Sequence, residues 1–594
     1  MGGFILKKNL KVFLILCMFS LFVIFSGACD KSSDPLFQQS QFNDFINDIF
    51  IEEVQQDTIS LNYTLAHPEN FGIEGSQVTL GEFSIDKMNE DLKDVEQYLK
   101  ELKKFDYDIL TSDQQLTYDI LMYSLEQELE VGNYLYYLEA LGPTTGLQAQ
   151  LPIILAEYNF YDKYDIETYL ELLPCVYDYI QDVAEFEKLK SKEGLFMSDS
   201  IADEIIQQCS SFIENPDQNF LIEYFNEKID NYPDLSKEEV DKYKKENREK
   251  VLDYIIPSYE LLIETLEELK GTGKYNGGLY DYPQGKAYYE YLVKSKTGSD
   301  KDMDQVIDML EKAVGDCILD VTKLSLTDPL LYDKIDSFDS FPLTDPDEIL
   351  ENLRIEITKD FPDLIEVDCD IKYVHESLSD YLSPAMYLVP ALDSYHDNSI
   401  YINGDDIETL SYIYTTVAHE SYPGHLYQNV YFKSLEPAYI RNILDFNGYD
   451  EGWATYVELY SYQMSGIDPQ LATLLEINNK LILSMYARTD IGIHYEGWTK
   501  DKAIAYINQF YEDPESSEEI YDTLLEEPAV YLPYAVGYLE ICELKDKTES
   551  IQGDSFNLKD FHKFLLDIGP APFKIINDRM DIWLNNDTED FIKK

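Results

Sequence analysis

The hydrophobic pattern from about residue 37 to residue 345 is typical of helices. Apolar residues recur every three or four positions, with charges between them, in segments such as "EDLKDVEQYLKELKKF" (90–105) and "VLDYIIPSYELLIETLEELK" (251–270). This is the periodicity of an amphipathic helix. Pro and Gly cluster at 273–284, and two prolines fall at 341–347, so both segments are predicted to be loops. We therefore expect a helical N-terminal region, 37–345, followed by a second region, 346–594.

The pattern changes near residue 364. The segment "LIEVDCDIKYV" (364–374) alternates between apolar and polar residues, and "SIYINGDD" (399–406) is a second short alternating segment that ends in a turn. Both patterns predict β-strands. Helical spacing returns from Ile407. The sequence thus predicts a mainly α fold, a large helical protein with a small β-sheet beside a helix that carries candidate metal ligands.

The N-terminus has the features of an export signal. Three lysines fall within the first eleven residues, and residues 12–25 are apolar except for one serine. Such a segment is short for a membrane span, which needs about 20 residues, but suits a signal peptide. The "SGAC" that ends at Cys29 is similar to a bacterial lipobox. We expect a signal peptide at 1–28, then a lipidated Cys29 and a polar tether at 29–36. The alternative is an ordinary signal peptide with an incidental cysteine.

Composition narrows the possible partners. The 594 residues include 46 Lys and Arg against 114 Asp and Glu, a net charge of −68, while 45% of the residues are hydrophobic. So negative a chain is a poor partner for nucleic acid, which binds basic surfaces. It is equally unsuited to docking electrostatically on anionic lipid. We expect an extracytoplasmic protein that contacts the bacterial cell membrane through its lipid anchor only. The oligomeric state stays open.

The segment "VAHESYPGHLYQ" (417–428) contains the strongest chemical signal. Zinc peptidases of the H-E-x-x-H type place two histidines four residues apart on one helical face, with the glutamate beside the metal-bound water. Here His425 follows His419 by six residues, which on a continuous helix would rotate it by about 240°. Pro423 and Gly424 lie between them, and both residue types break helices. We predict a break that brings the two imidazoles together, with Glu420 as the general base.

A third metal ligand is expected from "DEGWATYVE" (450–458). Glu451 lies near the start of a predicted helix, and Glu458 follows two turns later on the same face. Glu451 could instead simply favour the helix N-terminus. If residues 419–428 formed a regular helix, Glu458 or His494 would have to replace His425 as a ligand. Imidazole and carboxylate ligands make zinc the expected cofactor, although manganese or cobalt could substitute.

Two later segments could complete an active site. "ARTDIGIHYEGW" (487–498) offers Arg488, Asp490 and His494, although Arg488 and Asp490 could simply pair with each other. "EEPAVYLPYAVGYLE" (526–540) offers several tyrosines, among them Tyr534. A Tyr or His that donates to a developing oxyanion would assist hydrolysis.

The segments "HESYPGHLYQ", "DEGWATYVE", "RTDIGIH" and "EPAVYLPYAVGY" are together similar in order and spacing to the bacterial domain-of-unknown-function 885 family. That family is grouped with the gluzincin type of H-E-x-x-H metallopeptidases, and many of its members are lipoproteins. The resemblance implies that His419, His425 and Glu451 bind the metal and that Glu420 is the base. It also implies that a further set of residues contacts the substrate or the transition state, namely Arg488, His494 and Tyr534.

The function expected from these features is that of a membrane-anchored, zinc-dependent peptidase that hydrolyses peptide substrates. Two alternatives stay open. One is a non-catalytic lipoprotein that binds peptides or proteins on the same scaffold, although such a protein has no need of Glu420. The other is a metal-dependent amidase or esterase. We expect the active site in a deep cleft between the N-terminal helices and the second region.

Overall fold

A computed structural model describes residues 34–593 except 329, 375–384, 404–406 and 511–513. The expected signal peptide and Cys29 lie outside the described residues. Among the helices described, none combines the length and the apolar character that a membrane span requires. The fold is mainly helical and contains one three-stranded sheet. The predicted fold class is therefore confirmed.

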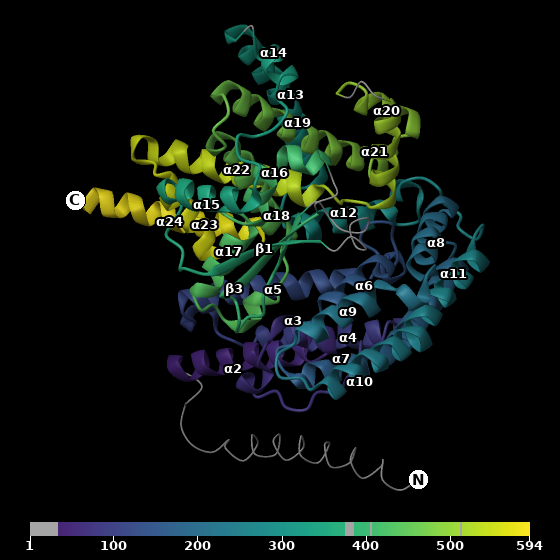
Figure 1. Ribbon diagram of the computed structural model, residues 1–594. Coiled ribbons are helices and arrows are strands. Elements are labelled where there is room, and N and C mark those ends of the chain that lie inside the picture. The colour runs from purple at the N-terminus through teal and green to yellow at the C-terminus, as the bar shows by residue number, and fades with distance from the viewer. Residues whose placement is uncertain (1–33, 329, 375–384, 404–406, 511–513, 594) are drawn as a thin grey trace.

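The first half of the chain forms two helical clusters, each with its own hydrophobic core. One core joins α2 to α5 and the other joins α6 to α11. In Figure 1 the helices α2, α3 and α4 lie below the sheet. The helices of this half are α2 (Pro35–Val54), α3 (Thr58–Thr64), α4 (Ile85–Leu102), α5 (Ser112–Val131), α6 (Leu147–Glu157), α7 (Lys163–Glu193), α8 (Asp199–Ile213), α9 (Phe220–Asn231), α10 (Lys237–Lys250) and α11 (Ile256–Leu269).

The second half contains the largest hydrophobic core. Residues of α12 and α13 pack in this core with residues of α18, α19 and α22, so the core continues across the expected boundary at residue 345. The helices of this half are α12 (Gly285–Thr297), α13 (Met303–Thr327), α14 (Leu331–Asp336), α15 (Pro346–Glu356), α16 (Ile407–Glu420), α17 (His425–Ser434), α18 (Asn447–Ser461), α19 (Pro469–His494), α20 (Lys500–Ile507), α21 (Pro514–Glu526), α22 (Leu532–Gln552), α23 (Leu558–Ile568) and α24 (Phe573–Lys593).

Helix α13 illustrates how the sequence specifies these elements. It begins with a capping box, in which the side chains of Asp302 and Gln305 each accept a hydrogen bond from the other residue's backbone N–H. This satisfies two donors that a helix start leaves free. The residues Val306, Leu310 and Ala313 follow at helical spacing and are buried. The amphipathic pattern therefore determines which face of α13 enters the core.

The sheet contains β1 (Asp368–Tyr373), β2 (Ala385–Leu388) and β3 (Asp397–Ile402), in the order β1-β3-β2. The strand β3 pairs with β1 in parallel and with β2 antiparallel. The two predicted strands correspond to β1 and β3, but β2 was not predicted. β2 lies at one edge of the sheet and contacts the C-terminal end of α16. The expected proximity of the sheet to the helix that carries His419 and Glu420, which is α16, is thus confirmed, and β2 makes the contact.

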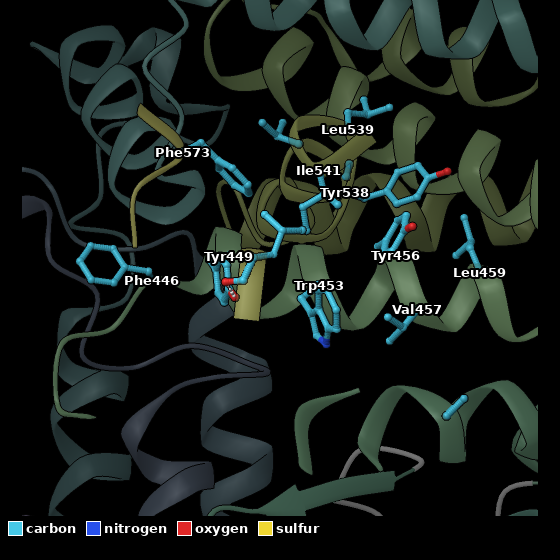
Figure 2. Packing of buried hydrophobic residues seen from close by; sticks show 14 of the residues in the cluster. Phe446, Tyr449, Trp453, Tyr456, Val457, Leu459, Tyr538, Leu539, Ile541 and Phe573 are labelled. Atoms are coloured by element: carbon cyan, nitrogen blue, oxygen red, sulfur yellow. Dashed lines mark hydrogen bonds between the residues drawn. The ribbon is translucent and has the colours of Figure 1, made fainter. Parts of the chain in front are cut away.

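Helices α18 and α22 cross at unusually close range because glycines occupy the crossing. A Cβ atom on Gly452 would lie 2.5 Å from the backbone carbon of Gly537, and one on Gly537 would lie 2.0 Å from the carbonyl oxygen of Gly448. Figure 2 shows aromatic residues of α18, among them Trp453, in the same cluster as Tyr538 of α22. This crossing brings the first turns of the two helices together. The predicted site residues Glu451 and Tyr534 lie in these turns.

Candidate metal centre

The helix that begins at Ile407 ends at Glu420, and the next helix begins at His425. The N–H of Gly424 donates to the carbonyl oxygen of Ala418 at 3.1 Å, which closes the turn between them. A Cβ atom on Gly424 would lie 1.7 Å from the carbonyl oxygen of His419, so only glycine fits there. The predicted break in the helix is confirmed, and it places His419 and His425 at facing helix ends.

The two histidines converge on Glu451, in the first turns of α18. The Oε2 atom of Glu451 lies 3.6 Å from Nε2 of His419 and 3.6 Å from Nε2 of His425. The imidazole rings are 4.8 Å apart and nearly perpendicular. One nitrogen or oxygen atom from each of the three residues falls within 4.8 Å of the other two, as a shared metal ion requires. The structure thus brings together all three predicted ligands.

The electrostatics of this group favour a cation. Glu451 Oε2 is buried and has no hydrogen-bond partner. Burial by itself raises the pKa of the Glu451 carboxyl, but His419 and His425 outweigh burial and lower it. Burial lowers the pKa of His419, but Glu451 and Glu458 outweigh burial and raise it well above the usual histidine value. A positive charge, either a proton or a metal ion, is therefore stabilised at this point. The donor set fits zinc.

A second carboxylate supports the first ligand. Oε2 of Glu458 lies 3.0 Å from Nδ1 of His419, and Asn479 of α19 donates to Oε1 of Glu458 at 3.3 Å. A carboxylate that binds the far nitrogen of a ligating histidine fixes its tautomer and orientation. Glu458 was predicted only as a substitute ligand. Its spacing of seven residues from Glu451 was the signal for this supporting role, whereas nothing in the sequence pointed to Asn479.

Glu420 is the last residue of α16 and lies beside the group. Its Oε2 atom accepts a hydrogen bond of 2.7 Å from the backbone N–H of Tyr387, on the edge strand β2. This contact orients the carboxylate. Tyr534 lies in the first turn of α22. Burial raises the pKa of its phenol most, and the charges of Glu451 and Glu420 raise it further, so Tyr534 lies near both carboxylates. The phenol therefore stays protonated and can donate a hydrogen bond. The contact of Glu420 with Tyr387 could not be predicted from the sequence.

His494 is placed differently from the prediction. Its Nδ1 atom accepts from the N–H of Leu279 at 3.0 Å, and its Nε2 atom lies 2.8 Å from the carbonyl oxygen of Leu524. The ring stacks on Tyr289 and is 1% exposed. Burial lowers the pKa of His494 to about 4. Both ring nitrogens are therefore engaged by the protein itself, and neither the predicted catalytic role nor a ligand role fits these contacts.

Arg488 also differs from the prediction. Its guanidinium is buried, donates to Glu311 at 3.1 Å and to Glu496 at 2.9 Å, and stacks on Trp498. Asp490 does not pair with it but accepts from the N–H of Ala529 at 2.9 Å. A substrate-binding role for Arg488 does not fit these contacts.

The "RTDIGIH" segment instead acts as a structural connection. Asp490 and His494 contact Ala529 and Leu524 respectively. Both contacts therefore fix the segment that leads into α22 and Tyr534.

A cavity of about 370 Å³ opens beside His425. It is lined by β2, by α17 and by segments between residues 441 and 450, together with Pro570. A larger cavity of about 1050 Å³ shares Phe432, Lys433, Arg441 and Asn442 with it and reaches α2 and α5. The larger cavity lies between the N-terminal helices and the second region, but none of the predicted site residues lines it. The cavity at His425 is formed by the second region alone, so the expected position of the site between the two regions differs from the structure.

Comparison with known proteins identifies the family of this chain. The model of the family described as "Bacterial protein of unknown function (DUF885)" matches residues 68–580. The chain belongs to this family. No curated protein matches it. All the predicted metal ligands of this DUF885 protein fall within the matched region.

Two solved structures share the fold of this DUF885 protein. A "putative lipoprotein" from Colwellia psychrerythraea has a TM-score of 0.81 and 18% identity, over 92% of this chain and 99% of that one. A "putative lipoprotein of unknown function" from Shewanella oneidensis has a TM-score of 0.64 and 16% identity, over 90% of this chain and 98% of that one. At this level of identity the likeness shows a shared fold and nothing more.

Proposed function

We propose that this DUF885 protein is a metal-dependent peptidase of gluzincin type, with zinc held by His419, His425 and Glu451. The observation that supports it most directly is the buried Glu451 Oε2 atom. That atom has no hydrogen-bond partner and is equally distant from the two imidazole nitrogens. A bound zinc ion lowers the pKa of a water and polarises a carbonyl group. The protein's own residues supply the proton transfers and the orientation of the substrate.

Glu420 is the group that accepts the proton of the attacking water and delivers it to the leaving nitrogen. Its carboxylate is held by the Tyr387 N–H, so the orientation is fixed before the substrate binds. Tyr534 is the donor to the oxygen that becomes negative when the carbonyl is attacked. Its phenol is kept protonated by burial and by the neighbouring carboxylates.

The choice of a peptide substrate rests on the sheet. β2 is an edge strand, and it touches Glu420 through Tyr387. Extended peptides bind along such edges by main-chain hydrogen bonds. The same metal ligands would also suit an amidase or esterase. A non-catalytic lipoprotein could use the same fold to bind peptides or proteins. An oriented Glu420 beside the metal group favours an enzyme over the binding protein.

The deciding experiment compares metal content and cleavage of a peptide library by the wild type and three variants. We expect His419→Ala to lose metal and activity together. Glu420→Gln should keep the metal and lose about 10²–10⁴-fold in kcat. The exposed His396 provides the control, since His396→Ala should keep both properties. Full activity in Glu420→Gln, or unchanged metal in His419→Ala, would refute the proposal. Hydrolysis of simple esters or amides without peptide cleavage would favour the amidase or esterase.

We also propose that the protein is held at the outer face of the cell membrane by a lipid on Cys29. The support is the "SGAC" segment together with the descriptions of the two structural neighbours as lipoproteins. Helix α2 begins at Pro35, so the tether between lipid and fold is short. Metabolic labelling with a fatty acid should mark the wild type and not Cys29→Ala. A wild-type protein without label would refute the anchor.

A further inference from the structure

The wall of the cavity at His425 is one continuous face of α17. His425, Gln428, Asn429, Phe432 and Lys433 all line it. Their spacing of three and four residues puts them on the same side of a helix. The helix that supplies a metal ligand at its start therefore extends a binding surface away from the metal. With a rise of about 1.5 Å per residue, Lys433 lies about 12 Å along the axis from His425.

Two buried cations lie at the far end of this cavity. Lys433 is 7% exposed and Arg441 is 4% exposed. The Lys433 ammonium donates to the carbonyl oxygen of Pro390 at 2.7 Å. The Arg441 guanidinium donates to the carbonyl oxygens of Ile568 and Pro570. Both cations are thus held in place by backbone carbonyl groups.

Neither cation has a carboxylate within 4.0 Å among the residues the structure describes. The Nε atom of Arg441 is buried and has no hydrogen-bond partner. In a chain with 114 acidic and 46 basic residues, an acidic partner for a buried cation would be easy to supply. Buried charges are normally paired, so two unpaired cations at one cavity indicate that the anion comes from a ligand.

Burial has a measurable cost at these cations. It lowers the pKa of Lys433 to about 7 and that of Arg441 to about 10. Asp393 offsets part of the effect at Lys433, but its carboxylate already accepts from the N–H groups of Ala66 and His67. A bound anion would restore the charged form of Lys433.

The acidic residues of the cavity lie at the opposite, metal end. Asp450 directly precedes the ligand Glu451 and accepts a hydrogen bond from Gln428, one turn beyond His425. Burial raises the pKa of the Asp445 carboxyl, and the nearby charge of Glu451 raises it further, so Asp445 also lies close to Glu451. The two carboxylates that line the cavity therefore lie near the candidate metal group, and its two cations lie at the far end. The far end attracts an anionic group.

We propose that Lys433 and Arg441 bind a carboxylate of the peptide substrate, two to four residues from the bond that is cleaved. The proposal rests on the proposed peptidase function. The spacing follows from the ~12 Å helix rise, since an extended peptide advances about 3.3 Å per residue. Helical side chains also lean toward the N-terminus of their helix, here toward His425. The carboxylate is either the C-terminus of a short peptide or an Asp or Glu side chain.

The test measures binding of N-acetylated alanine peptides, two to six residues long, to the zinc-loaded Glu420→Gln variant. In the first series each peptide is prepared once with a free C-terminal carboxylate and once as the C-terminal amide. In the second series one alanine of each C-terminal amide is replaced, at each position in turn, by Glu or by Gln. We expect an anionic form to bind at least about tenfold more tightly than its neutral counterpart, because hydrogen bonds to charged groups are strong. Preference for the free acid identifies the C-terminus, and preference for Glu over Gln in the amides identifies a side chain.

Variants at the far end of the cavity show where the preference arises. Adding Lys433→Met to Glu420→Gln should abolish it. Lys433→Gln should do the same while keeping a donor for the Pro390 carbonyl. The matched control is Lys228→Met, since the Lys228 ammonium also donates to two backbone carbonyls but does not line this cavity. This control should keep the preference, and unfolding curves verify that each variant folds.

Two failures can be told apart. Peptides that are bound and cleaved with no difference between anionic and neutral forms overturn the carboxylate site and leave the peptidase function intact. A preference for the anionic forms that survives both Lys433 variants also overturns the carboxylate site and leaves the peptidase function intact. A metal-loaded protein that neither binds nor cleaves any peptide of the panel refutes the peptidase function and the carboxylate site together.

Discussion

The indole N–H of Trp453 donates a hydrogen bond of 2.9 Å to the carbonyl oxygen of Pro423. Trp453 is fully buried on α18, two residues from the candidate ligand Glu451, and Pro423 lies in the turn between the two candidate ligand histidines. A single side chain thus joins the two chain segments that supply the candidate metal ligands. The Trp of "DEGWA" and the Pro of "YPGH" therefore belong to one interaction.

We predict that Trp453→Phe weakens zinc binding about tenfold, since groups that orient ligands typically contribute this much. It should also lower the free energy of unfolding of the metal-free protein by about 1–3 kcal/mol, because the buried Pro423 carbonyl loses its partner. Zinc titration and denaturant unfolding measure the two effects. Trp498→Phe is the control, since the Trp498 N–H has no hydrogen-bond partner. Unchanged zinc affinity in Trp453→Phe would contradict the positioning role.

We predict that Glu458→Gln reduces metal affinity about 10–100-fold, because the amide holds the Nδ1–H of His419 less strongly than a carboxylate does. Competition with a zinc chelator measures the change. Glu540→Gln is the matched control. Glu540 is buried and pairs with Lys301 at 2.8 Å, but it lies outside the group of candidate ligands. It should lower stability without changing metal affinity. An equal loss of affinity in both variants would show that the effect is general destabilisation.

The approach of His419 to His425 was predictable because its determinants are local. The Pro423-Gly424 pair breaks the helix wherever it stands, and the i+6 spacing of His419 and His425 needs such a break. The strand β2 was missed because "AMYL" is only four residues long and has no clear alternation. The largest core continues across the expected boundary at residue 345, since residues of α12 and α13 are buried against α18, α19 and α22.

The roles of Arg488 and His494 could not be predicted from the sequence, because their partners are distant along the chain. His494 accepts from Leu279, 215 residues away, and Arg488 donates to Glu311, 177 residues away. A His or Arg in a motif looks the same whether it contacts substrate or holds a helix. Only burial and the engagement of both ring nitrogens distinguish the two roles.

We predict that Gly452→Ala destabilises the protein by about 1–3 kcal/mol, because the added methyl group forces α18 and α22 apart. It should weaken metal binding as well, since Glu451 precedes the crossing. Gly315→Ala is the control. Gly315 lies within α13, and a Cβ atom there would meet nothing within 4 Å. This control should gain about 0.5–1 kcal/mol from its higher helix propensity. Denaturant unfolding of both variants measures the difference. A neutral Gly452→Ala would mean that the crossing tolerates a methyl group.

The last prediction uses pH to separate a structural His494 from a catalytic one. Burial lowers the pKa of His494 from 6.5 to about 4, so the folded protein holds the neutral ring. Between pH 6.5 and pH 4 the unfolded chain binds a proton that the folded chain does not. The stability contributed by His494 is therefore complete above pH 6.5 and is lost as the pH falls toward 4. A shift of this size corresponds to about 3 kcal/mol.

His494→Asn tests this prediction, because the Asn oxygen can still accept from the Leu279 N–H. Denaturant unfolding of the two proteins at pH 4 to 7.5 measures the gap in free energy. We expect this gap to shrink by about 3 kcal/mol as the pH falls from 6.5 toward 4. His67→Asn, at an exposed position, should show no such trend. A constant gap would show that the ring does not stay neutral in the fold. Full stability of His494→Asn combined with a large loss of kcat would instead restore the catalytic role that the structure argues against, because a residue that only packs cannot affect chemistry without affecting folding.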